Sequence, residues 1–312
     1  MATQPQITQT PEMITQNALV ATVRRNTEVT IWQRVRRNRT ATISLAAALF
    51  VVLAALLGPL LYRVNPAATD FAALNSAPSA RHLLGSDNLG RDTLARLLQG
   101  LRVSLLVALV AETINIVLGA TIGVLAGYFG GWIDNILSRL ADMLFAFPGL
   151  LLAILVAAIW GPAITDRYGG VGRLLLVATA ISLVTWPLMA RYVRSQTLSL
   201  REQEYVNAAR ALGSGDWRLI THHMLPNLFG LVITAATLDV VGVIVGESVL
   251  SLLGLGTQPP MASIGRMISD AVPFFARSSF QVFVPCATLT ALVLIFSFLG
   301  DSLLDILDPR GR

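Results

Sequence analysis

Lysine is absent from this chain of 312 residues, and all 23 of its basic side chains are arginine. Without lysine the chain cannot build a P-loop around ATP phosphates or form a Schiff base with a carbonyl substrate. Cys286 is the single cysteine, which excludes an intrachain disulfide, a thiolate zinc site and an iron–sulfur cluster. Three histidines, His82, His222 and His223, are too few for a haem or di-iron bundle.

Charged residues are also scarce. They make up 13% of the chain, whereas hydrophobic residues make up 54%, and a soluble domain carries about 25% charged residues. Long apolar runs account for the difference, and a membrane-spanning helix needs about 20 such residues. The composition predicts an all-α polytopic membrane protein with six transmembrane helices. We place them at residues 42–61, 103–127, 140–160, 174–190, 229–250 and 282–300.

The arginines indicate the orientation of the spans. Six of them precede the first span, and only Arg63 follows it closely. Because basic residues flank spans on the cytoplasmic side, the N-terminus is predicted to be cytoplasmic, and six spans return the C-terminus to that side. The high pI of about 10.1 is therefore read as a topology signal, and no nucleic-acid partner is expected. The six arginines are Arg24, Arg25, Arg34, Arg36, Arg37 and Arg39.

This topology divides the chain into five parts, none of them large enough for a separate enzymatic domain. They are a cytoplasmic arm at 1–40, partly disordered and with a basic amphipathic segment suited to membrane lipid; a first transmembrane helix at 41–62; an extracytoplasmic segment at 63–102; a core at 103–305 with five further transmembrane helices, a turn at 161–173 and a cytoplasmic loop at 191–228; and a cytoplasmic tail at 306–312. Within the extracytoplasmic segment, we expect a surface helix from Leu84 to Arg102 with Asp87 as its N-cap.

Four carboxylates fall within or near the predicted spans, where an ionisable group is costly unless it is paired or hydrated. Asp142 is expected to pair with Arg139, one helical turn earlier. For Glu112 both a translocation path and a structural pair remain open. Asp239 is assigned to the path. Glu247 either lines the same path or anchors the loop that follows it.

Two further patterns bear on function. Gly119, Gly123, Gly127 and Gly131 recur every four residues, and Gly242 and Gly246 make a shorter stripe; both favour close packing within the membrane over a subunit contact. No HExxH or GxSxG motif occurs, and no histidine falls within a predicted span. We therefore expect no catalytic residues and no metal site.

The loop 191–228 is the most informative stretch. Residues 202–212 favour a helix with an alanine-rich face, which Gly213 and Gly215 end. Asp216 is expected to N-cap a second short helix, and Pro226 to end that helix before the fifth span. The result is either a knob that docks into a partner's groove or an ordinary loop.

The same loop resembles the EAA motif of ABC-importer permeases, which reads Glu-Ala-Ala, three residues, Gly, nine residues, Ile, one residue, Leu-Pro. Asn207-Ala208-Ala209, Gly213 and Leu225-Pro226 stand at that spacing. Two positions depart from the motif, because Asn207 replaces the glutamate and His223 the isoleucine.

Three other stretches, in the expected order, are similar to the C-type permeases of dipeptide and oligopeptide importers. Residues 82–92 resemble the signature before the second span, with Ser86 where threonine is usual. Residues 250–260 resemble the segment after the fifth span, and residues 300–309 the C-terminal ending. The signature residues are Gly85, Asp87, Gly90, Arg91 and Asp92.

The resemblance implies a type I ABC-importer permease core in the bacterial cytoplasmic membrane. It implies four kinds of partner: membrane lipid, a homologous B-type permease, two ATPase subunits and an extracytoplasmic substrate-binding protein. ATP and Mg would be bound by the ATPases, so no cofactor is expected in this chain. The implied ATPase-coupling residues are Asn207, Ala208, Ala209, Gly213, Asp216, Leu225 and Pro226.

The implied function is import of dipeptides or oligopeptides, with this chain forming half of the translocation path. Nickel chelates, glutathione and oligosaccharides are alternative cargoes of the same complex type. A membrane scaffold without transport activity is a distant alternative. The candidate residues for the path are Glu112, Asp239 and Glu247.

Overall fold

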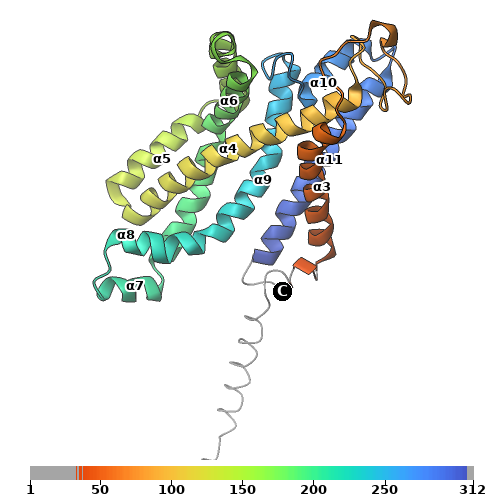
Figure 1. The fold of residues 1–312 in the computed structure, drawn as a ribbon. Helices are drawn as coiled ribbons and strands as arrows, with labels where there is room; N and C mark the ends of the chain where they lie inside the picture. The colour runs from red at the N-terminus through yellow and green to blue at the C-terminus, as the bar shows by residue number, and fades with distance from the viewer. Residues whose placement is uncertain (1–32, 34, 37, 308–312) are drawn as a thin grey trace, which may run out of the picture.

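A computed structural model describes residues 33, 35–36 and 38–307 (Figure 1). No β-strand occurs in this part of the chain. The helices are α3 (Arg39–Leu61), α4 (Thr93–Phe129), α5 (Gly131–Phe145), α6 (Gly149–Arg201), α7 (Glu204–Ala211), α8 (Asp216–Arg218), α9 (Leu225–Leu252), α10 (Ile264–Ala271) and α11 (Ser279–Leu307), with 3-10 turns at Phe71–Ala73 and Val272–Phe274 and a π-helical turn at Leu219–Met224. Most of the predicted N-terminal arm and tail lies outside the described residues.

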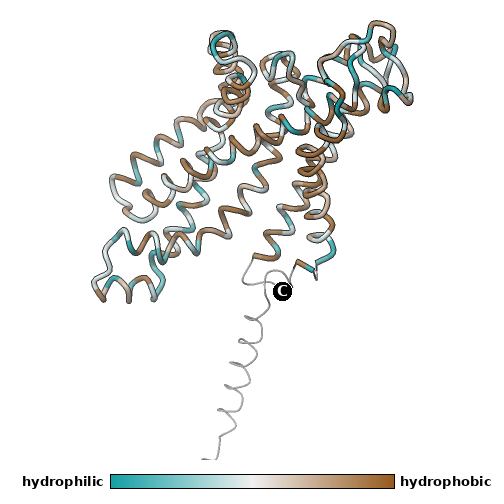
Figure 2. The backbone as a smooth tube through the Cα atoms, viewed as in Figure 1, coloured by the Kyte–Doolittle hydropathy of each residue, from teal (hydrophilic) through white to brown (hydrophobic). Residues whose placement is uncertain are grey.

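In the part of the chain that the structure describes, five helices are long and apolar enough to cross a membrane, which confirms the predicted all-helical membrane class. Figure 2 shows hydrophobic residues along these helices and hydrophilic residues gathered toward their two ends. One end holds α7 and α8, and the other holds α10 with the segment before α4 (Figure 1). The five helices are Arg39–Leu61, Thr93–Phe129, Gly149–Arg201, Asp216–Leu252 and Ser279–Leu307.

Helix α6 contains most of the third and fourth predicted spans. It is interrupted at Gly169, whose φ of 63° and ψ of −154° are not helical, so the predicted turn at 161–173 shrinks to a kink. The start of the third span, predicted at residue 140, is wrong: α5 ends at Phe145 and α6 begins at Gly149. Pro148 explains the break, because proline disfavours helix in the residue before it and lacks a donor.

Helix α4 begins later than predicted. The expected surface helix from Leu84 with Asp87 as its cap is wrong, because α4 starts at Thr93 and runs without interruption into the second span. Asp92 is the N-cap, and its Oδ1 accepts from Ala95 N at 2.8 Å. Asp87 Oδ1 instead accepts from Leu89 N and Arg91 N, each at 2.9 Å, and so holds a turn.

The long glycine stripe lies where α4 packs on the second part of α6. A Cβ at Gly119 would lie 2.7 Å from Met189 Cβ, and one at Gly127 would lie 2.7 Å from Thr197 Cβ. Real Cβ atoms do not approach that closely, so a larger residue would separate the helices. The stripe is therefore an intramolecular packing surface at Gly119, Gly123 and Gly127, but not at Gly131, where an added Cβ would meet no atom within 4 Å.

Candidate functional site

Residues 204–226, which include α7 and α8, form a short knob at one end of the longer helices (Figure 1). Val206 is fully buried and packs in one apolar cluster with Leu219 and Met224, which holds α7 against the start of the next helix. Gly213 has φ of 86°, a left-handed conformation that residues with a Cβ adopt at a cost. Its N–H donates to Arg210 O at 3.0 Å, so the chain reverses directly after α7.

The predicted coupling residues gather on this knob. Six of the seven are exposed, and Ala209 is half-buried. Sequence reasoning missed two neighbours, Leu212 and Trp217, which are 88% and 75% exposed. The signal was present, because both are large apolar residues placed on either side of a polar glycine turn.

Two predicted details of the knob are wrong. Gly215, not Asp216, is the N-cap of α8, and Asp216 Oδ1 accepts from Tyr128 OH at 2.6 Å. Pro226 does not end the helix, because one helical run extends from Asp216 to Leu252. A π-helical turn precedes Pro226, and such turns change the hydrogen-bond register without ending a helix.

Two carboxylates lie at the same level where α4 packs on α9. Ser104 of α4 donates to Glu247 of α9, and the two helices run in opposite directions, so Glu112 and Asp239 lie equally far from that contact along each helix. Glu112 is 6% exposed. Asn115 Nδ2 donates to Glu112 Oε1 at 3.3 Å, and Thr185 Oγ1 donates to Asn115 Oδ1 at 2.9 Å. Glu112 Oε2 and Asp239 Oδ2 are buried and accept no hydrogen bond.

Glu247 lies apart from this pair, in a cluster of hydroxyls. It is fully buried, and it accepts from Ser104 Oγ at 2.9 Å and from Ser251 Oγ at 2.6 Å. Ser263, the N-cap of α10, lies 3.0 Å from Ser251 Oγ. These contacts join α4, α9 and the start of α10.

The signature residues at the α10 end bind one another and α10. Arg91 Nε donates to Asp87 Oδ2 at 2.6 Å, and its Nη2 to Asp270 Oδ2 at 3.2 Å. Arg96, 4% exposed, donates to the same Asp270 oxygen at 2.8 Å and also pairs with Asp87. The network fixes the segment before α4 to α10.

Asp92 makes a second tie at this end. Its Oδ2 accepts from Tyr62 OH at 2.9 Å and lies 2.9 Å from His82 Nδ1. Burial raises the pKa of Tyr62, and the hydrogen bond to Asp92 adds to the shift. Gly85 and Gly90, with φ of 72° and 75°, turn directly against the backbone of Ser76 and Asp70, where a side chain would not fit.

The comparisons with known proteins agree with this arrangement. Residues 119–312 match the family described as binding-protein-dependent transport system inner membrane component, and residues 29–78 match the N-terminal TM domain of oligopeptide transport permease C. The chain belongs to the first of these families. As a permease of this family it is a multi-pass protein of the bacterial inner membrane.

Individual relatives cover nearly the whole permease. A dipeptide transport system permease protein DppC of Alkalihalophilus pseudofirmus is 38% identical over 90% of this chain and 89% of its own length. A glutathione transport system permease protein GsiD of Pectobacterium atrosepticum is 36% identical over 89% and 90%, respectively. An oligopeptide transport system permease protein OppC of Mycobacterium bovis is 34% identical over 90% and 94%.

One solved structure shows the fold of the permease core. A chain of the MetNI methionine ABC transporter in an inward-facing conformation has a TM-score of 0.53 and 18% identity. It covers 68% of this chain and 96% of that one. Among the described residues, no group of three His, Cys, Asp or Glu side chains could hold a metal ion.

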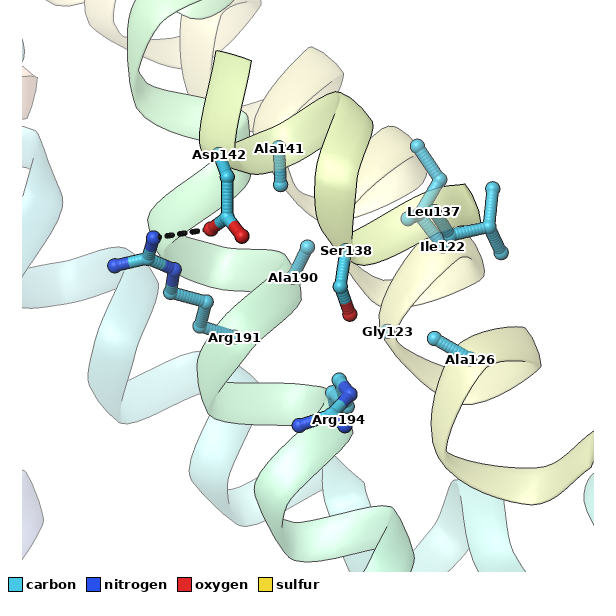
Figure 3. A pocket seen from close by; sticks show the side chains of 10 residues that line it. All are labelled: Ile122, Gly123, Ala126, Leu137, Ser138, Ala141, Asp142, Ala190, Arg191 and Arg194. Carbon is cyan, nitrogen blue, oxygen red and sulfur yellow. Dashed lines mark hydrogen bonds and ion pairs between the residues drawn. The ribbon is translucent and has the colours of Figure 1, made fainter. Parts of the chain in front are cut away.

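The permease also has a cavity of about 370 Å³ between α4, α5 and α6 (Figure 3). The predicted pair of Asp142 with Arg139 is wrong: Asp142 Oδ1 accepts from Arg191 Nη2 at 2.6 Å beside this cavity, because α5 packs against α6. Arg194 donates two hydrogen bonds of 2.5 Å to Asp134 and thereby lowers the pKa of that carboxyl.

Arg173 is a structural residue that sequence reasoning used only as a span boundary. It is 4% exposed, and its guanidinium donates to Gly256 O at 2.9 Å and to Ala157 O at 3.2 Å. It forms no ion pair with a described residue. It therefore ties the loop after α9 to both parts of α6 through backbone carbonyls alone.

Proposed function

We propose that this chain is the C-type permease subunit of an ABC importer for dipeptides or oligopeptides. The observation that carries the proposal is the knob itself, on which six of the seven coupling residues are exposed beside the uncovered side chains of Leu212 and Trp217. Relatives with dipeptide and oligopeptide permease names cover about nine tenths of the chain and support the same conclusion.

In this proposal the permease has six transmembrane segments and both termini in the cytoplasm. Counting the two parts of α6 separately, before and after Gly169, gives the sixth segment. The α7 end then lies in the cytoplasm, and the α10 end lies outside. The arginines before the first span support this orientation.

The knob is the contact to the ATPases. Leu212 and Trp217 would enter apolar pockets of an ATPase subunit, where large buried side chains contribute most of the binding free energy. Two ATPase subunits bind ATP and Mg, a homologous B-type permease completes the path, and a binding protein delivers cargo outside. ATP-driven closure of the ATPases then moves α7 and the helices tied to it.

The translocation path runs beside α9. Glu112 and Asp239 line it, because unsatisfied carboxylates at membrane depth mark aqueous or cargo-binding surfaces. Glu247 is assigned to loop anchoring, since both of its oxygens already accept from serine hydroxyls.

Glutathione is the second candidate cargo. The glutathione permease of Pectobacterium atrosepticum is nearly as similar to this chain as the dipeptide permease, at 36% against 38% identity. The permease sequence therefore separates these two cargoes poorly.

Reconstituted transport tests the proposal. The complete complex, with its partner permease, ATPases and binding protein, is placed in proteoliposomes and supplied with ATP. We expect ATP-dependent uptake of labelled dialanine, and uptake of glutathione instead would favour the second cargo. If neither compound accumulates, the proposed function is wrong.

A further inference from the structure

We propose that Glu112 and Asp239 together bind the protonated amino group of the cargo during translocation. This inference rests on the proposed function, and it names the chemical group that the path recognises. The site is a pair of carboxylates supplied by two different helices.

The position of the pair suits a translocation path. Glu112 lies at the middle of α4, and Asp239 lies at the middle of α9. Both helices are candidate membrane spans, so the pair falls near the centre of the bilayer. An ionisable group there is retained only where it is compensated or functional.

The charges of the pair are not compensated within the described chain. Neither carboxylate forms an ion pair with an arginine, and each has one buried oxygen that accepts no hydrogen bond. Glu112 is more than nine tenths buried, so bulk water does not compensate it. Two like charges in such a place require a cation or a proton between them.

The surrounding hydrogen bonds prepare Glu112 as an acceptor. Thr185 donates to Asn115, and Asn115 donates to Oε1 of Glu112. Asn115 is thus held in place by Thr185 and occupies one oxygen of the carboxylate. Oε2 is left as an acceptor without a donor.

Glu247 shows what this fold does with a buried carboxylate that needs no ligand. Both of its oxygens accept from serine hydroxyls, whereas the pair at Glu112 and Asp239 lacks such donors. The side of α9 next to Asp239 is also uncovered, because a Cβ at Gly242 would meet no atom within 4 Å. The missing donors are therefore expected from a molecule that passes along α9.

An organic ammonium fits this site better than a metal ion. Its three N–H groups can each donate to a carboxylate oxygen, and every linear peptide carries one at its N-terminus. Calcium and magnesium need about six or more oxygen ligands, and the described residues hold no cluster of three potential ligands.

Equilibrium binding to the purified complete transporter, without its binding protein, tests the proposal. Labelled dialanine and labelled N-acetyl-dialanine are the two probes, which differ in the ammonium. We expect the wild type to bind dialanine at least about tenfold more tightly, equivalent to about 1.4 kcal/mol. Glu112→Gln combined with Asp239→Asn should abolish that preference. Thr113→Val is the matched control, because Thr113 is exposed and its hydroxyl bonds only to Leu109 O of its own helix.

Several results would overturn the proposal. They are equal binding of both probes, binding of neither probe, or an unchanged preference for dialanine in the double variant. An unchanged preference would mean that the two carboxyls share a proton instead of binding the ammonium. The wild-type probe comparison needs no variant, so a misfolded mutant does not block the test. Uptake of dialanine by proteoliposomes separates this failure from failure of the proposed function, because uptake can persist when the preference is absent.

Discussion

The two ends of this permease differ in how their charged residues are used. At the α10 end, Asp87, Arg91, Arg96 and Asp270 are paired with one another, although Phe71 and Phe275 leave apolar surface exposed there. At the α7 end, Leu212 directly after α7 and Trp217 in α8 are both uncovered. The charged network of the α10 end is therefore completed within the chain, whereas the apolar pair of the α7 end is left for a partner.

The largest expected effect comes from breaking the α10 end. Arg96→Met removes the most buried guanidinium of the network and leaves Asp87 and Asp270 to Arg91 and Arg266 alone, and breaking a buried ion pair costs about 3–5 kcal/mol. We expect loss of most folded permease from the membrane, measured as yield of monodisperse protein and its Tm. Arg81→Met is the control, because Arg81 is 79% exposed and its pair with Asp70 should contribute under about 1 kcal/mol. Equal losses of folded permease in both variants would show that the ion pairs of Arg96 do not hold the α10 end together.

The next largest effect is on coupling. Gly213→Val places a β-branched residue at φ of 86°, which costs about 1–2 kcal/mol and changes the turn after α7. We expect folded complex with little peptide uptake per ATP hydrolysed, measured in proteoliposomes. Gly215→Ala should behave as wild type, because φ there is −69° and a Cβ meets no atom within 4 Å. Wild-type coupling in Gly213→Val would show that the turn is not part of the contact.

A smaller effect is expected from the exposed apolar pair. Leu212→Ser with Trp217→Ser should lower the fraction of ATPase that copurifies with the permease by severalfold, since interface aromatics contribute at least about 2 kcal/mol. The Tm of the isolated permease should stay unchanged because both side chains are exposed. Trp217→Phe keeps an aromatic side chain and should retain most of the ATPase. A changed Tm with unchanged copurification would contradict this assignment.

The smallest effect concerns pH. Arg194 lowers the pKa of Asp134, so this carboxylate stabilises the fold above its ordinary pKa of about 4, and the contribution is lost as pH falls through the lowered folded-state value. Asp134→Asn should reduce Tm at pH 7. The difference in Tm between the variant and the wild type should shrink as the pH falls below 4. A difference independent of pH between 7 and 3 would mean that packing, not charge, explains it.

Much of the fold could be predicted from the sequence because apolar runs and arginine flanks report directly on the membrane. Helix boundaries could not be predicted at positions where a single residue interrupts an apolar run. Pro148 ends a helix inside a predicted span, whereas Pro226 sits after a π-helical turn and ends nothing. Asp92 caps α4 because Asp87 is already used in a turn.

The candidate site was predictable to a similar degree. The coupling motif located the knob, but the exposure of Leu212 and Trp217 depends on tertiary structure that spacing does not reveal. The hydroxyl cluster around Glu247 and the carbonyl contacts of Arg173 join segments distant in sequence, and so does the packing that brings Glu112 of α4 to the level of Asp239 on α9. Such contacts follow from helix packing, which periodicity alone does not specify.

Site-directed crosslinking tests the comparison between the two ends most directly. Leu212→Cys and Arg81→Cys are each introduced beside Cys286→Ser, and the assembled complex is treated with a short thiol crosslinker carrying a photoreactive group. The account predicts that residue 212 crosslinks to an ATPase subunit in high yield and that residue 81 does not. Crosslinking of the ATPase from residue 81, or none from residue 212 in an active complex, would contradict it.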